Sequence, residues 1–293
     1  MKLFKTALAS ILLISGFSAS SQVVYKVEGN GLKEPSYIFG THHLAPVSVA
    51  GDFGATDLFN KASQVVGEID MTQDQMQMQM AMQPYMMAPA DSTLSKVLSK
   101  DEYDSLNESF KKWAPMPGLD LSMLEPMKPM VVTTMVTVGI TAKEVPDFNP
   151  AEQLDTWFQA SGKKDGKKII PLETAEQQAA LLFNFTPISL QAEALTELLN
   201  EPEKSVENAR KLTQAYMKQD LNAMLELSQQ EDEHPEFMEA LLDKRNADWL
   251  TKLPAIFNDG STFVAVGALH LAGDKGVVEG LRKLGYTVTP VSK

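Results

Sequence analysis

Short apolar runs separated by polar turns divide the chain into strand-like segments. They are rich in Val, Ile, Tyr and Phe, as buried strands are, and occupy residues 23–27, 37–39, 64–69, 168–172, 262–266 and 286–291. Between the first two runs, Glu28-Gly29-Asn30-Gly31 is typical of a hairpin turn. A short helical candidate at 56–62 lies between the second and third runs, so this segment is long enough to cross over between parallel strands.

A second crossover is predicted near the C-terminus, where a helix from about 274 to 284 is followed by Gly285 and the last strand. From 174 to 257, Leu, Ala, Met and Phe recur at helical spacing, with breaks at Pro187, Pro202 and Pro235. We therefore predict an α/β (mixed α+β) fold, with a central, mostly parallel sheet and βαβ units at both ends of the chain. Residues 22–293 would form one domain with a large helical insertion at 174–257.

The first 21 residues have the order of a secretory signal peptide. Lys2 and Lys5 precede an apolar run at 7–17, and small residues follow at 18–21. The alternative is a membrane anchor, but the run is shorter than the ~20 residues that span a bilayer. We expect removal of residues 1–21 and a periplasmic or secreted protein without stable membrane insertion.

Charge and cysteine content narrow the possible functions. The formal net charge is −12, which disfavours a nucleic-acid partner. The chain has no cysteine, so thiol nucleophiles, disulfides and cysteine-ligated metals are excluded. With four histidines in 293 residues, an imidazole site can be assembled in few ways.

Two segments repeat the pattern Gly-x-x-His-Leu-Ala after an apolar strand. The histidine of the pattern is His43 in the first segment and His270 in the second. Glu68 and Glu173 also lie at the ends of predicted strands. If the strands are parallel, these side chains share the carboxyl edge of the sheet, where α/β proteins bind ligands. Two imidazoles and a carboxylate can hold a catalytic divalent ion. The alternatives are structural histidines and a Glu173 that only caps the following helix.

The segment 71–87 holds seven of the 16 methionines. Met76 and Met80, and likewise Met78 and Met82, are four residues apart, so a helix would present thioethers on two faces. Three interpretations remain open: a Cu(I) site, a pliable surface for peptides, or packing over the core or a second copy of the chain.

Six short motifs occur in order along nearly all of the mature chain. They are Tyr37-Ile-Phe-Gly-Thr-His-His-Leu44, Glu68-Ile-Asp70, Leu172-Glu-Thr174 with Gln177, Arg245-Asn246, Val266-Gly-Ala-Leu-His-Leu271 with Gly273, and Leu284-Gly-Tyr286. In this order they resemble the TraB/GumN/Tiki family. The resemblance implies a mixed α/β fold of the erythromycin-esterase/ChaN-like kind. For the Tiki branch, it implies a metal-dependent protease that uses manganese or cobalt.

The resemblance also assigns roles to single residues. His43 and His270 correspond to the motif histidines, Glu68 to the motif carboxylate, and Arg245 with Asn246 to a polar pair on the last helix of the insertion. The residue before the first motif histidine is usually apolar in the family. Here it is His42, so either imidazole could reach a metal.

Together these observations predict an exported metal-dependent hydrolase, most simply a peptidase, acting on a peptide or small molecule. His43, His270 and Glu68 would hold manganese, cobalt or zinc, and Glu68 could instead be the base. Arg245 and Asn246 would bind a substrate carboxylate or oxyanion, with His42 and Glu173 in supporting or alternative positions. The rival hypothesis is a periplasmic binding protein for a ligand, haem or Cu(I). A homo-oligomer is left open.

Overall fold

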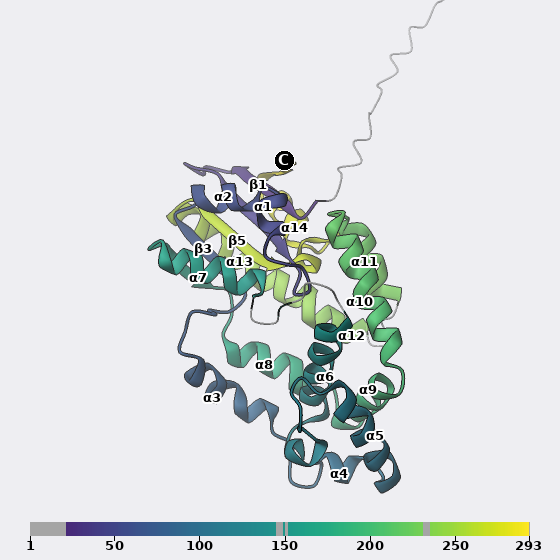
Figure 1. Ribbon diagram of the computed structural model, residues 1–293. Helices are drawn as coiled ribbons and strands as arrows, with labels where there is room; N and C mark the ends of the chain where they lie inside the picture. The colour runs from purple at the N-terminus through teal and green to yellow at the C-terminus, as the bar shows by residue number, and fades with distance from the viewer. Residues whose placement is uncertain (1–21, 145–148, 150–151, 231–234, 293) are drawn as a thin grey trace, which may run out of the picture.

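The computed structural model describes residues 22–144, 149, 152–230 and 235–292. A six-stranded sheet occupies the upper part of the molecule in Figure 1, with the strand order β4-β3-β5-β2-β1-β6. Its strands are β1 (Val24–Gly29), β2 (Ser36–Thr41), β3 (Gln64–Gly67), β4 (Lys168–Pro171), β5 (Thr262–Gly267) and β6 (Tyr286–Pro290). All six predicted strands are present, each within two or three residues of its expected ends.

The sheet is mostly parallel, as predicted. β3 pairs in parallel with β4 and with β5, and β5 pairs in parallel with β2. β1 is antiparallel to both β2 and β6, so the predicted hairpin between β1 and β2 is confirmed. The two predicted crossovers do connect strands of the same direction, but other strands lie between them: β5 separates β2 from β3, and β2 with β1 separates β5 from β6.

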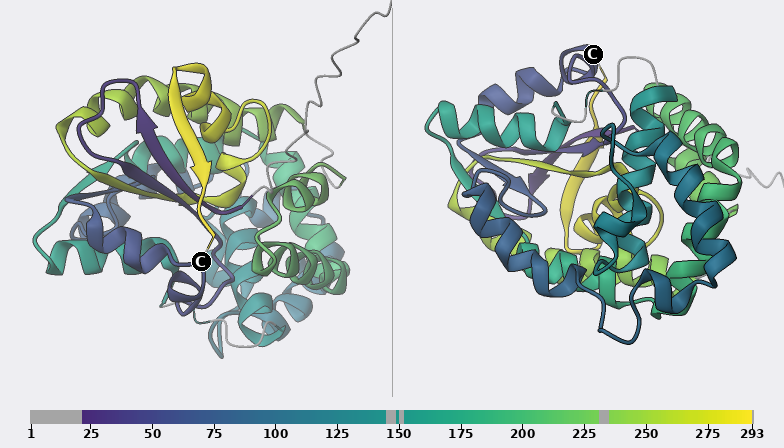
Figure 2. Two further views of the ribbon diagram at one scale, coloured as in Figure 1. Left: turned by 90° about the horizontal axis from the view of Figure 1, so that it is seen from above. Right: turned by 60° about the horizontal axis from the view of Figure 1, so that its bottom comes forward.

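Helices cover both faces of the sheet. On one face lie α1 (Val49–Asp52), α2 (Ala55–Lys61) and α7 (Leu154–Lys164), and on the other α13 (Arg245–Asp259) and α14 (Val277–Lys283), as the view from above shows (Figure 2). Phe158 of α7 contacts Phe39 and Phe263 of the sheet at ring-centroid distances of 5.5 and 4.6 Å. Such aromatic contacts add to the apolar area that is buried between helix and sheet, so α7 is held firmly over the central strands.

A second group of helices lies below the sheet in Figure 1 and packs around two apolar clusters of its own: a larger one that includes Leu106, Phe110, Val136 and Leu195, and a smaller one that includes Ala179 and Phe183. Its members are α3 (Gln75–Met86), α4 (Leu94–Val97), α5 (Lys100–Trp113), η1 (Leu121–Leu124), α6 (Pro129–Glu144), α8 (Ala175–Asn184) and α9 (Ile188–Asn200). Helices therefore fill the β3–β4 connection as well as the predicted β4–β5 connection. Helix α6 was not predicted individually, because half of its residues are Val or Thr, which are typical of strands.

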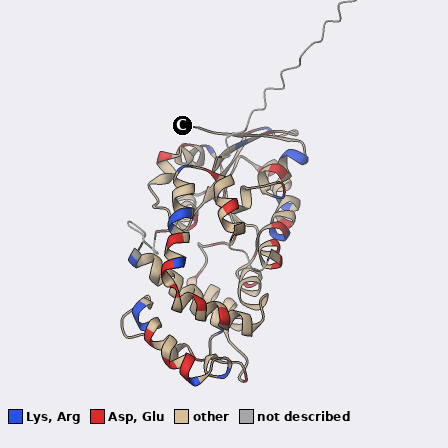
Figure 3. Ribbon diagram, turned by 90° about the vertical axis from the view of Figure 1, so that its right-hand side faces the viewer, with Lys and Arg blue, Asp and Glu red and all other residues tan. Residues whose placement is uncertain are grey.

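The remaining helices join this group to the sheet. They are α10 (Pro202–Met217), α11 (Leu221–Gln230), α12 (Pro235–Met238), the π-helix η2 (Glu239–Lys244) and the short 3₁₀ helix η3 (Ala268–Leu271). Acidic and basic residues are interspersed along the sequence of the outer helices (Figure 3). None of the helices among the described residues is long and apolar enough to cross a membrane. The predicted signal peptide lies outside the described residues.

The methionine-rich segment forms α3, which Asp74 caps through the backbone N–H of Gln77. Met76 and Met80 are 70% and 66% exposed. Met82 and Met86 instead pack against the small apolar cluster of Val131, Ala179 and Phe183. Thus one side of the helix presents thioethers to solvent, whereas the other contributes to the packing of α6 and α8.

Gly67, the last residue of β3, gives room to the side chain that braces the following loop. A Cβ atom there would lie 2.1 Å from Nε2 of the buried Gln159 on α7. Gln159 Nε2 donates to Ile69 O, and Gln159 Oε1 accepts from Met71 N. Gly67 therefore lets Gln159 hold the chain that leads away from Glu68.

We expect Gly67→Ala to lower the free energy of unfolding by about 1–3 kcal/mol, the usual cost of overpacking. Urea denaturation would measure it. Gly51→Ala is the matched control, because nothing lies within 4 Å of a Cβ atom there. Shortening the brace in Gly67→Ala/Gln159→Ala should relieve the clash. Equal stability of Gly67→Ala and wild type would disprove this account.

Candidate functional site

Four parallel strands end at one edge of the sheet, and polar residues follow each of them. His42 and His43 follow β2, Glu68 follows β3, Glu173 comes two residues after β4, and His270 lies in η3, directly after β5. The strand register aligns Thr41 with Gly267 and Gly67 with Pro171. Because β3 and β5 pair Val66 with Val264, these side chains emerge within a few residues of one another at that edge.

The two motif glycines permit close approach between neighbouring segments. A Cβ atom on Gly40 would lie 2.9 Å from Ala268 Cα, and one on Gly267 would lie 3.3 Å from Glu68 Oε1. Neither glycine has a positive φ. A left-handed backbone conformation is therefore not the reason for glycine here. Its lack of a side chain lets Gly267 N donate to Glu68 Oε1 at 2.9 Å.

Arg245, the first residue of α13, lies at the centre of the cluster and is 9% exposed. Its Nε donates to both oxygens of Glu173, and Nη2 donates to Glu173 and, at 2.6 Å, to Glu68 Oε2. Nη1 donates to Leu241 O and to His270 Nε2 at 3.0 and 2.9 Å. A guanidinium has five N–H donors. All five are used within the protein, so as arranged here Arg245 positions other side chains and has no donor left for a substrate.

The buried His270 is fixed in one tautomer by its neighbours. Because Arg245 can only donate, Nε2 of His270 must accept, and the proton is on Nδ1. Nδ1 donates to Asn246 Oδ1 at 2.7 Å, while Asn246 Nδ2 donates to Lys275 O. The ring also packs on Trp249, with centroids 4.3 Å apart. Burial, with the charge of Arg245, lowers the pKa of His270 to about 4 although Glu68 opposes this. The imidazole is thus neutral at pH 7.

Glu68 accepts hydrogen bonds on both carboxylate oxygens. Oε1 accepts from Gly267 N, and Oε2 accepts from Arg245 and from Gln178 Nε2, the latter at 3.1 Å. Burial alone would raise the pKa of Glu68, but the interactions with His270 and Arg245 and the Gly267 hydrogen bond outweigh it and lower the pKa to about 2. The carboxylate is therefore ionised and firmly held. Its side chain is 20% exposed, so one part still faces solvent.

His43 contacts a different carboxylate. Its side chain is 68% exposed, and its Nδ1 lies 3.4 Å from Oδ2 of Asp155 on α7. The other oxygen of Asp155 accepts from the Thr41 hydroxyl at 2.7 Å. The nearby Asp155 side chain is the main cause that raises the pKa of His43. Burial opposes the rise, and the charges of Asp155 and Glu68 add to it. The Glu68 carboxylate is therefore within electrostatic reach of this imidazole.

His42 points away from the cluster, toward α10. Its Nε2 lies 3.0 Å from the Thr213 hydroxyl, and its ring packs near Tyr216 with centroids 5.1 Å apart. Thr213 uses its own hydrogen to donate to Ala209 O, so His42 is the donor in this pair. Burial, followed by the neighbouring His43, lowers the pKa of His42 to about 4. His42 ties the β2 loop to the helices.

The structure thus joins five residues that the sequence singled out: Glu68, Glu173, Arg245, Asn246 and His270. Glu173 pairs with Arg245 and does not cap α8, because Thr174 and Gln177 form the capping box of that helix. Sequence reasoning missed Asp155 and Gln178. No local signal marks Asp155, since its partner Thr41 is 114 positions away.

As arranged here, these donors do not fit a divalent metal ion. Both ring nitrogens of His270 and both oxygens of Glu68 are engaged within the protein, and His43 faces Asp155. Among the described residues, no group of three or more His, Cys, Asp or Glu side chains is placed to hold a metal ion.

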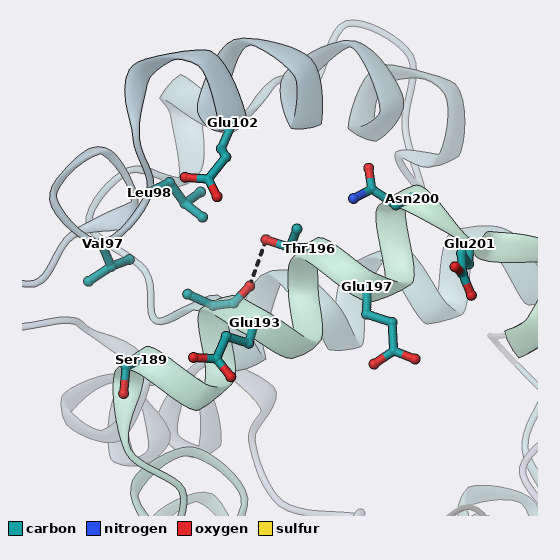
Figure 4. Close-up of a pocket in the computed structure, with 10 residues that line it drawn as sticks. Val97, Leu98, Glu102, Ser189, Glu193, Thr196, Glu197, Asn200 and Glu201 are labelled. Atoms are coloured by element: carbon teal, nitrogen blue, oxygen red, sulfur yellow. Dashed lines mark hydrogen bonds between the residues drawn. The ribbon is translucent and has the colours of Figure 1, made fainter.

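A separate cavity of about 610 Å³ lies between α4, α5 and α9 (Figure 4). Val97, Leu98 and Ala192 provide its apolar lining, and Glu102, Glu193 and Glu197 are among the acidic residues at its sides. None of the residues that the sequence singled out lines it. This cavity belongs to the helical group and not to the edge of the sheet.

Comparison with known proteins gives one match. A model of the TraB/PrgY/gumN family matches residues 23–290. No curated protein and no solved structure matches the chain. The matched range includes every strand and every residue of the cluster described above.

Proposed function

This chain belongs to the TraB/PrgY/gumN family, and on that premise we propose that it is an exported hydrolase whose preferred substrate is a peptide. The observation that carries the proposal is the position of His43. Its exposed imidazole stands at the carboxyl edge of parallel strands, within electrostatic reach of Glu68, which belongs to a buried network with Arg245, Glu173 and His270. That edge is where α/β sheets bind ligands.

The geometry supports a general-base role for His43. Asp155 approaches Nδ1 and is itself held by Thr41, so the ring is oriented with Nε2 left for a water molecule. The attacking water would give its proton to Nε2, and the proton would then pass to the leaving amine. His43 thus takes one proton from the water and gives one to the amine, and it ends hydrolysis of the peptide bond in its starting protonation state. Glu68, whose side chain is 20% exposed, would face the substrate, and Arg245 and His270 hold it in place from behind.

The test is a screen of peptide substrates with purified protein, run with and without added manganese or cobalt. Cleavage by the wild type that is lost in His43→Ala would support the proposal. Dependence of the cleavage on added ion would instead support the metal-dependent mechanism expected from the sequence. No cleavage by the wild type, together with stoichiometric binding of haem or Cu(I), would favour the rival binding protein, for which exposed Met76 and Met80 are candidate ligands.

Export has its own test. We expect the mature protein to begin at Ser21 or Gln22, because both cleavage positions leave small residues at −3 and −1. Intact-mass analysis of protein recovered from the periplasm or the medium would measure this. A recovered protein that retains Met1 would contradict the proposal for localisation, and would leave the proposal for hydrolysis untouched.

A further inference from the structure

The space between the Glu68 and Glu173 carboxylates and the His270 imidazole is filled by a cationic side chain. We infer that the Arg245 guanidinium is the resident cation of this site and keeps divalent metal ions out of it. The inference concerns the site of the proposed hydrolase but does not need hydrolysis to occur. Binding measurements can therefore fail or succeed separately from the substrate screen.

The ligand atoms at this site are already occupied by Arg245. Two carboxylates and one imidazole nitrogen, the kinds of atom that bind Mn²⁺, Co²⁺ and Zn²⁺, converge on one guanidinium. Glu173 accepts from Nε and Nη2, Glu68 accepts from Nη2, and His270 Nε2 accepts from Nη1. An ion that used these atoms would have to displace all of these hydrogen bonds.

Arg245 is itself held in place by its neighbours. Nη1 donates to Leu241 O in the turn before it, and the guanidinium packs over the Trp249 ring with its carbon 4.8 Å from the ring centroid. The side chains of Arg245 and Glu173 are 9% and 8% exposed. If the Arg245 side chain left the site, the carboxylates of Glu68 and Glu173 would remain mostly buried without a cation, which is energetically costly. Arg245 is thus a fixed part of the site.

The orientation of His270 also resembles that of a metal-binding histidine. Asn246 accepts the proton on Nδ1, so the lone pair of Nε2 points at Arg245. In metal sites, the second nitrogen of a ligating histidine is oriented in the same way by a hydrogen-bond acceptor, which leaves the first nitrogen for the ion. Here Arg245 Nη1 takes the place of the ion. Removing the guanidinium would therefore expose a preoriented nitrogen together with two carboxylates, and these would close into the vacated space around an ion, since around Arg245 they are too far apart to share one.

The experiment is isothermal titration of the full mature protein with MnCl₂, CoCl₂ and ZnCl₂ after treatment with chelator and dialysis. We expect no saturable binding by the wild type and one equivalent bound by Arg245→Ala. The gained binding should disappear in Arg245→Ala/His270→Ala and in Arg245→Ala/Glu173→Gln. Arg282→Ala is the control for the loss of an arginine, because Arg282 pairs with Glu279 on α14, away from the cluster.

A thermal scan of the same proteins gives a second readout. An ion that binds only the folded state raises the midpoint of unfolding, so added ion should stabilise Arg245→Ala and leave the wild type unchanged. One equivalent bound by the wild type and lost in His43→Ala or His270→Ala would overturn the inference and support the metal site expected from the sequence. It would also be overturned if folded Arg245→Ala bound no ion. If Arg245→Ala does not fold, the titration of the wild type alone tests the inference, because saturable ion binding at this site would overturn it.

Discussion

Replacing His43 by alanine should lower the rate of peptide hydrolysis by roughly two to four orders of magnitude, the usual contribution of a general base. The loss should be in kcat, because the imidazole acts on the attacking water rather than on substrate affinity. The fold should remain intact, since the side chain is 68% exposed and its contact with Asp155 lies at the edge of the sheet. Steady-state kinetics on the best substrate from the screen, with circular dichroism to check folding, would measure both effects.

His42→Gln is the matched control for this experiment. The adjacent His42 donates to Thr213 on α10, and a glutamine amide can keep that hydrogen bond. Its rate should therefore stay close to that of the wild type. If His42→Gln abolishes cleavage and His43→Ala does not, the two histidines have been assigned the wrong roles. Equal activity of wild type and His43→Ala would mean that another group is the base.

Replacing Arg245 by methionine should lower the free energy of unfolding by about 3–5 kcal/mol, as is typical when one partner of a buried ion pair is removed. The guanidinium is 9% exposed and satisfies Glu68 and Glu173 together with His270. Methionine fills much of the volume but leaves two carboxylates without a cation. Urea denaturation at pH 7 would measure the loss. Lys168→Met is the control, because its ion pair with Asp259 is exposed and worth about 0–1 kcal/mol.

Two further measurements separate lost charge from lost packing. In Arg245→Met, neutralising both acids through Glu68→Gln and Glu173→Gln should restore part of the stability, because no unpaired charge then remains. Burial already raises the pKa of Glu173, and without Arg245 nothing comparable lowers it. A carboxylate with a raised pKa in the folded state favours folding at low pH. The deficit of Arg245→Met should therefore shrink between pH 8 and pH 5. A deficit that is independent of pH and of the two neutralising changes would indicate lost packing alone.

Alternation of apolar runs and turn residues was sufficient to predict the six strands, since each strand carries its own signal within four to six residues. The Glu28-Gly29-Asn30-Gly31 turn likewise encodes the β1–β2 hairpin, because neighbouring residues decide it. The sequence also predicted parallel crossovers, but it did not reveal that β5 enters between β2 and β3. That order depends on packing between segments about 200 positions apart, and no local pattern records it.

At the site, position along the chain was enough to place Glu68, Glu173, His43 and His270 after parallel strands, because strand ends fix where such residues emerge. Only the tertiary structure decided what these side chains do. Arg245 comes from a helix that follows Glu68 by 177 positions, and its guanidinium lies at the point where the sequence had predicted a metal ion. Asp155 reaches His43 from a third element. The order of the motifs indicates which residues lie near the same edge of the sheet. Which of their atoms form hydrogen bonds with one another depends on how the whole core packs.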